Sequence, residues 1–278
     1  MNGKQTAIFG FSLSVVLLTV SYIPAIKWMV ERWMEPESYY SHGFLVPVIS
    51  LFIAWTRRGS LKDAKMDTGI NGLVIAGVFL LINIASASLR IYFISGFTLV
   101  FVLYGLVLHF FGRVVVKNML FPIFFLLAMV PLPLVLIGNL TVALKLFVAD
   151  SSVFVLNLIG FPSVRDGSMI RMPGSFILVA APCSGLRSLI ALLTLGVVFA
   201  YAAKISLFRK SLLCLSAIPI ALASNLARIT VLAIVNDLYG QKVAMGFFHD
   251  FSGLMVFVLA FVGLFSVNNL LEDGAGNG

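Results

Sequence analysis

The chain has 278 residues, of which 60% are hydrophobic and 11% are charged, and it carries a net charge of +8. Water-soluble domains contain roughly 25% charged residues, so this composition excludes a soluble globular protein. Most lysines and arginines stand in short loops beside apolar runs, where they orient a membrane protein rather than bind nucleic acid. We therefore expect the lipid bilayer, and no nucleic acid, as a partner.

The apolar stretches are near the 20 or so residues that a helix needs to cross about 30 Å of hydrocarbon. Strands of a membrane barrel give weaker, alternating runs of about 10 residues. The predicted fold is therefore an all-α integral membrane protein, a polytopic bundle of about eight transmembrane helices. It is predicted to form a single domain over residues 1–271, followed by a disordered tail at 272–278.

The first half of the chain contains five predicted spans, at residues 7–27, 43–56, 69–88, 92–111 and 118–137. A short aromatic and acidic segment, Trp28 to His42, separates the first two. Pro122, Pro131 and Pro133 are expected to kink or divide the fifth span. Polar residues interrupt the next segment, 139–160, which favours an amphipathic helix that lies in the membrane interface.

The second half begins with the one plainly polar stretch, residues 161–182. Its prolines and glycines, and the alternation of apolar and polar residues over 168–172, predict a small β-hairpin or ordered loop outside the membrane. Three more spans are predicted at 186–203, 211–227 and 251–270, with a mixed segment at 229–248 between the last two.

The basic residues predict the orientation of the chain. If the N-terminus is inside, the inner loops hold clusters such as Arg57-Arg58, whereas the basic residues of the outer loops are nearly all isolated. Both termini are then expected in the cytoplasm, and the chain in the inner (plasma) membrane. The polar stretch 161–182 and the residues considered next would lie at the extracytoplasmic face.

Cys183 is the leading candidate for chemistry. It lies in Ala181-Pro182-Cys183-Ser184-Gly185, a polar break directly before an apolar run. A helix that begins nearby directs unpaired N–H groups toward the sulfur, and Arg187 adds a positive charge, so both favour the nucleophilic thiolate. The plainer alternative is a buried cysteine that packs as a small hydrophobic side chain. Cys214, inside an apolar run, takes that alternative, and no disulfide or metal site is expected.

Two further polar positions accompany the cysteine. Asn225 and Arg228 stand three residues apart at the predicted end of the span 211–227, where both offer hydrogen-bond donors to an oxyanion. His249 precedes the last span, and an imidazole suits proton transfer at neutral pH. An arginine that snorkels to the interface and an interfacial histidine without a role are the alternatives. His42, at the outer entrance to the second span, is a candidate substrate-site residue.

Together these motifs resemble the exosortase/archaeosortase family of membrane transpeptidases. The matching elements are the segment around Cys183, Asn225-x-x-Arg228, His249, and an early Tyr40-Ser41-His42-Gly43 motif. The resemblance covers about residues 7–270 and implies that Cys183, Arg228 and His249 form the catalytic set. It also implies substrates that end in a sorting tail: a short motif (Pro-Glu-Pro in the bacterial type), a transmembrane helix and a basic end.

The expected reaction is attack by Cys183 on the scissile carbonyl, which gives a thioester that an acceptor then resolves. His249 would act as acid and base, and Arg228 with Asn225 would stabilise the oxyanion. Arg171 and Arg187 would attract an acidic residue of the motif. The acceptor is expected to be a lipid or polysaccharide, and no metal or organic cofactor is expected. The alternatives are a polytopic transporter or flippase, and a non-catalytic subunit of a polysaccharide export system.

Overall fold

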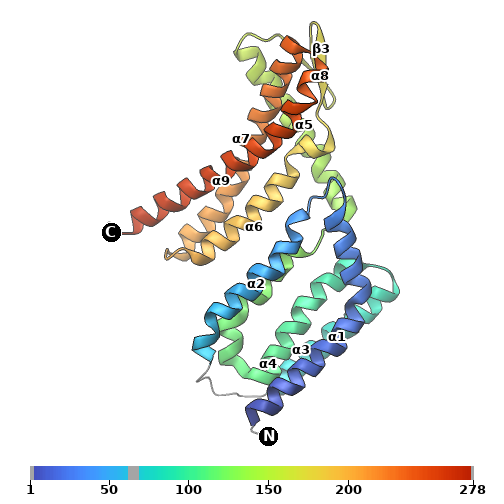
Figure 1. Ribbon diagram of the computed structural model, residues 1–278, viewed down its shortest axis with the longest axis vertical. Coiled ribbons are helices and arrows are strands. Elements are labelled where there is room, and N and C mark those ends of the chain that lie inside the picture. Colours follow the sequence, from blue (N-terminus) through green and yellow to red (C-terminus); the bar gives the residue numbers. More distant parts are fainter. Residues whose placement is uncertain (1–2, 62–68, 277–278) are drawn as a thin grey trace. The chain divides into compact units, whose positions relative to one another are not determined.

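The computed structural model describes residues 3–61 and 69–276. Its contacts group into two compact units, Met1–Pro133 and Leu134–Gly278, which are considered one at a time. The sequence analysis expects one domain over this length, and that expectation stays a prediction. Figure 1 labels the helices and strands of both units.

The regular elements of the first unit are all helices within its described residues. Its elements are α1 (Gly3–Met34), η1 (Ser41–Phe44), α2 (Leu45–Thr56), η2 (Arg57–Leu61), α3 (Ile70–Ser88), α4 (Tyr92–Phe125) and η3 (Leu126–Met129). Helices α3 and α4 pack closely where glycines face each other: a Cβ on Gly105 would lie 2.7 Å from the backbone of Gly72. Small residues let helix backbones approach in this way inside a membrane.

Helix α4 reverses direction at Gly112, where the backbone is not helical (φ 81°, ψ 179°). The rings of Phe101 and Phe124 lie 5.6 Å apart, although a straight helix would separate them by about 35 Å at about 1.5 Å per residue. The two limbs correspond to the separate spans that the sequence predicts on either side of Arg113 and Lys117. The second limb ends at Phe125, and η3 continues to Met129 before the chain becomes extended.

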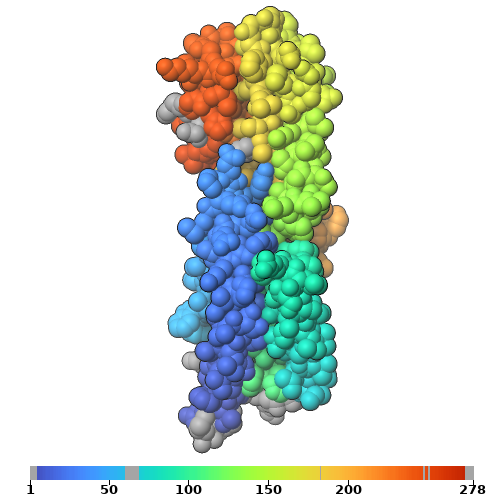
Figure 2. All heavy atoms as spheres, turned by 90° about the vertical axis from the view of Figure 1, so that its right-hand side faces the viewer, coloured from blue at the N-terminus to red at the C-terminus, as the bar shows by residue number. Residues whose placement is uncertain are grey.

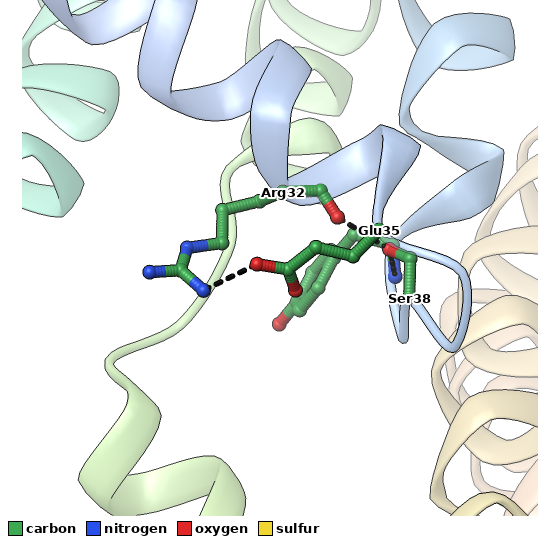
Figure 3. Close-up of polar contacts among 4 residues, drawn as sticks. Arg32, Glu35 and Ser38 are labelled. Carbon is green, nitrogen blue, oxygen red and sulfur yellow. Dashed lines mark hydrogen bonds and ion pairs between the residues drawn. The ribbon is translucent and has the colours of Figure 1, made fainter.

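The turn after α1 is tied down by short-range hydrogen bonds. The Ser38 hydroxyl donates to the carbonyl of Arg32 at 2.6 Å, and the Arg32 guanidinium pairs with Glu35, as Figure 3 shows. The indole of Trp33 donates to the carbonyl of Met129 at 2.9 Å, so the end of α1 is joined to η3. These contacts fix the start of the segment that carries His42.

The second unit combines helices with a small sheet. Its elements are α5 (Leu134–Leu158), β1 (Val164–Asp166), β2 (Met169–Met172), β3 (Ser175–Leu178), η4 (Ala181–Ser184), α6 (Leu186–Ala202), α7 (Leu207–Tyr239), α8 (Gln241–Ala244) and α9 (Phe247–Gly276). The strands form an antiparallel sheet in the order β1-β2-β3. The predicted hairpin is therefore confirmed, with one strand more than expected.

Helix α7 joins two parts of this unit. It has 33 residues and is about 50 Å long, well beyond the roughly 30 Å of a bilayer core. Its first part packs against α6 and α9 around a buried cluster. Its last turns pack against α5 and β3 around a second cluster, the cap cluster, made of Val148, Ala149, Leu156, Ile170, Met172, Ile177, Val179, Cys183, Ile229, Leu232 and Ala233. The predicted break after residue 227 is thus replaced by a continuous helix.

Six helices of the described chain are long and apolar enough to cross a membrane: Gln5–Met34, Ile70–Ser88, Tyr92–Met129, Leu134–Leu158, Leu207–Tyr239 and Phe251–Glu272. This confirms the polytopic all-α membrane fold, with eight spans as an approximate count. Helix α5 differs from the interfacial helix predicted at 139–160, since it begins earlier and has the length and composition of a span. Helix α9 extends to Gly276, so most of the segment predicted to be a disordered tail is helical, and 277–278 lie outside the described residues.

Candidate active site

Cys183 lies in a short 3₁₀ turn that leads directly into α6. Its backbone N–H donates to the carbonyl of Ala180 at 3.0 Å, and Gly185 then adopts a left-handed conformation (φ 83°, ψ −3°) before the helix begins at Leu186. The first N–H groups of α6 have no acceptor within the helix and carry its positive dipole end. The cysteine therefore stands where a helix N-terminus favours negative charge, as the sequence predicts.

Asn225 connects α7 to the backbone of the cysteine. It is 1% exposed, and its Nδ2 donates to the carbonyl oxygen of Cys183 at 2.9 Å. Gly185 is required for this approach because a Cβ at that position would lie 3.0 Å from Cγ of Asn225. The glycine thus supplies both the left-handed turn and the space for the amide.

His249, in the first turn of α9, meets the cysteine. The distance from Cys183 Sγ to His249 Nε2 is 3.4 Å, which allows a hydrogen bond to sulfur. The cysteine is 3% exposed and the histidine is half-buried. The two residues are 66 positions apart, so the fold of α6, α7 and α9 brings them together. A proton on either atom can pass directly to the other.

Arg228 holds the turn that carries the histidine. Its Nη2 donates to the carbonyl oxygen of His249 at 3.1 Å, and its Nε donates to the hydroxyl of Ser252 at 3.1 Å. Ser252 in turn donates to the same His249 carbonyl at 3.0 Å. The guanidinium therefore ties α7 to the first turn of α9 and fixes the position of the imidazole.

Arg187 lies in the first turn of α6, four residues after the cysteine. Its Nε and Nη2 atoms are buried and have no hydrogen-bond partner within the residues that the structure describes. Arg187 as a whole is half-buried, but two buried guanidinium nitrogens without an acceptor are unfavourable, so this side chain is suited to receive an acidic group from a ligand.

Two predicted site residues remain, one in each unit. The Arg171 side chain points to the opposite face of the sheet from Ile170 and Met172, which pack with Cys183 in the cap cluster, and it pairs with Asp166 at 2.7 Å. His42 belongs to the first unit, where its ring stacks on Tyr40 at 5.9 Å. Burial lowers the pKa of His42, and a hydrogen bond with the Ala128 backbone opposes this effect only in part.

Sequence reasoning missed Ser252, which accepts a hydrogen bond from Arg228 and donates one to the His249 carbonyl in α9. Its spacing was a usable signal, because Ser252 follows His249 by three residues and so lies on the same face of the helix. It also missed Gly185 as the residue that makes room for Asn225. Within the described residues, no three His, Cys, Asp or Glu side chains form a group that could hold a metal ion.

The arrangement therefore offers a thiol, an imidazole that touches it, and an arginine that fixes the imidazole, all beside a helix N-terminus. A thiol in contact with an imidazole can serve as a nucleophile with its acid and base. No curated protein and no solved structure matches the chain. The family model for transmembrane exosortases (Exosortase_EpsH) matches residues 33–266, most of the chain and both units. The chain belongs to the transmembrane exosortase family, whose members are membrane proteases or transpeptidases of sorting signals.

Proposed function

We propose that this membrane protein cleaves the C-terminal sorting signals of exported proteins through a thioester on Cys183. The contact of 3.4 Å between the cysteine sulfur and His249 Nε2 is the observation that carries this proposal. The cysteine is buried, so the reaction proceeds in a site from which bulk water is largely excluded.

The proposed first half-reaction begins when His249 Nε2 takes the proton of the thiol. The thiolate attacks the scissile carbonyl carbon, and the negative charge passes to the carbonyl oxygen of the tetrahedral intermediate. The imidazolium then gives its proton to the leaving amine, the C–N bond breaks, and a thioester remains on Cys183. The released fragment is the transmembrane helix with its basic end.

In the second half-reaction an amine or hydroxyl of the acceptor attacks the thioester and loses its proton to His249. The C–S bond breaks, and the proton returns to the sulfur. A lipid or polysaccharide acceptor makes the reaction a transpeptidation or its ester equivalent, whereas water makes it hydrolysis. The basic clusters of the sequence support an extracytoplasmic site in the inner membrane, where exported substrates arrive.

Arg228 is proposed to serve the reaction in two ways. Its Nε and Nη2 atoms hold the turn of His249, and its third nitrogen, Nη1, is assigned to the developing oxyanion. Asn225 is engaged with the carbonyl of Cys183, so we assign it to hold the nucleophile, and the first N–H groups of α6 supply further oxyanion donors. Arg187 is assigned to an acidic side chain of the sorting motif because its buried guanidinium nitrogens need an anion.

The test compares Cys183→Ala with Cys183→Ser in cells that express a protein with a sorting tail. Unprocessed substrate is expected to accumulate in Cys183→Ala, because the nucleophile is lost. Cys214→Ala is the matched control, since this second cysteine packs in the helical core away from His249, and it should process normally. Normal processing by Cys183→Ala would remove the cysteine from the mechanism.

A further inference from the structure

The strand β3 presents an open edge. Its pairing with β2 places Ile170 opposite Ile177 and Met169 opposite Leu178, and the N–H of Val179 donates to the carbonyl of Ser168 at 2.9 Å. Because hydrogen-bonded and non-hydrogen-bonded pairs alternate along an antiparallel ladder, the backbone groups of Phe176 and Leu178 point away from β2. The Phe176 carbonyl accepts Nδ2 of Asn236 at 3.0 Å, so the outer edge presents the N–H of Phe176 together with the N–H and carbonyl of Leu178.

A cavity of about 190 Å³ lies along this edge. One wall is β3, and the other is formed by Asn236 near the end of α7 with Gln241 and Met245 beside α8. Figure 1 places β3 and α8 at the same end of the second unit, and in Figure 2 yellow and orange atoms meet at this end. We call this cavity, with the β3 edge, the edge groove; its lining is largely apolar.

Asn236, which lines the groove, has a hydrogen-bond acceptor without a partner among the described residues. The residue is 3% exposed, and its Nδ2 donates to the carbonyl of Phe176 at 3.0 Å, which identifies the other amide atom as the oxygen. This oxygen, Oδ1, is buried and has no partner within the part of the chain that the structure describes. A buried acceptor is unfavourable without a donor, so the groove is suited to a ligand that brings an N–H group.

One lining residue of the groove contacts the backbone of the nucleophile. Ala180 lines its end, and the carbonyl of Ala180 accepts the N–H of Cys183 at 3.0 Å. A ligand that follows β3 in the direction of the chain is therefore directed toward the turn that holds Cys183. A peptide substrate must extend from its binding site to the nucleophile, whereas a lipid or a second copy of the protein need not.

We propose that the edge groove binds the recognition segment of the sorting signal as an added strand beside β3. The segment accepts from the N–H groups of Phe176 and Leu178 and donates to the Leu178 carbonyl, while the Phe176 carbonyl keeps its bond from Asn236. A further N–H group of the segment donates to Asn236 Oδ1, and one apolar side chain fills the cavity. Strand addition of this kind derives affinity from the main chain and specificity from a side-chain pocket. This inference rests on the proposed function, because it assumes that the peptide continues to Cys183.

The test uses two matched charges on the same face of the sheet. Leu178 and Val164 are both exposed, at 51% and 68%, and lie on opposite edge strands. Leu178→Arg places a charge in the groove, whereas Val164→Arg places one on the far edge. With a sorting-tail protein as substrate, Leu178→Arg is expected to raise KM at least tenfold with kcat within threefold, and Val164→Arg to leave both unchanged. Equal effects of the two variants, or none, overturn the proposal.

Three further measurements keep a folding defect and a catalytic defect apart from lost recognition. The rate of Cys183 alkylation by iodoacetamide should be the same in both variants and the wild type, and Met245→Trp, which fills the cavity from its other wall, should reproduce the KM effect. Binding of a fluorescent peptide from the sorting tail to the Cys183→Ala protein should weaken at least tenfold with Leu178→Arg. Unaltered peptide binding would refute the proposal that the groove binds the peptide, even if cleavage depends on Cys183. Weakened peptide binding would support this proposal, even if cleavage does not depend on Cys183.

The peptide itself provides a check on strand pairing. N-methylation of successive amides should weaken binding at alternate positions, because only every second N–H of an added strand faces β3. Equal weakening of binding at every position, or weakening at one position only, would exclude strand pairing.

Discussion

Replacing Gly185 by alanine tests the packing that sets the nucleophile. A non-glycine residue in a left-handed conformation costs about 1–2 kcal/mol, and the new Cβ would lie 3.0 Å from Cγ of Asn225. If Asn225 withdraws, its hydrogen bond to the Cys183 carbonyl is lost as well, which adds about 1 kcal/mol. We expect Gly185→Ala to lower the free energy of unfolding by about 2–3 kcal/mol.

The same substitution is expected to reduce catalysis, because a misplacement of about 1 Å in a reacting group costs up to about 10²-fold in rate. We expect kcat/KM for a sorting-tail substrate to fall about 10- to 100-fold in lipid nanodiscs, alongside a lower melting temperature. The control is Gly160→Ala, which shares the positive φ (88°) but meets no atom within 4 Å. It should lose stability and retain kcat/KM. Equal losses of activity in the two variants, or none in Gly185→Ala, would refute this account of the site.

Three further predictions concern charged and titratable side chains. Arg228→Lys is expected to lower kcat at least 100-fold because one ammonium cannot replace two directed N–H donors. Ser252→Ala leaves the arginine on the His249 carbonyl and should lower kcat less than tenfold. Similar losses of kcat for the two variants in single-turnover assays would contradict the assigned roles. Arg187→Met should raise the melting temperature of the free enzyme and also raise KM, since two buried guanidinium nitrogens with no partner among the described residues are exchanged for an apolar chain; a lower melting temperature would count against it. Burial lowers the pKa of His42 in the folded state, so below about pH 6.5 the unfolded state binds more protons than the folded state does. The folded state therefore loses stability as the pH falls through that range. His42→Gln should therefore show a smaller drop in melting temperature between pH 7.5 and 5.5, and an unchanged drop would exclude this cause.

The helical membrane fold was predictable because apolar run length is a direct consequence of bilayer thickness. The reversal at Gly112 was also accessible, since Arg113 and Lys117 mark an aqueous turn between two apolar limbs. The break predicted after residue 227 was wrong for a physical reason. The polar residues beyond Arg228 indicate that the surroundings of the helix change, and the helix itself continues to Tyr239. Hydropathy indicates whether lipid or water surrounds a segment, and it does not show where a helix ends.

The candidate site was predictable in its residue types but not in its contacts. Cys183 and His249 stand at polar breaks before helices, and the structure brings them to 3.4 Å. Side-chain rotamers decide whether Asn225 donates to the Cys183 carbonyl and Arg228 to the His249 carbonyl. A single sequence does not determine those rotamers. His42 shares no compact unit with the cysteine, so its role in substrate binding stays a prediction.

The unbroken course of α7 has a consequence for the choice of cleavage point. The same helix carries Asn225, which holds the cysteine, and Asn236, which borders the groove, and these residues are 11 positions or about 16 Å apart along a rigid rod. An extended peptide covers that interval with about five residues. The enzyme would then behave as a molecular ruler, tolerant of many side chains between the anchor point and the bond to be cut, and intolerant of an inserted or deleted residue.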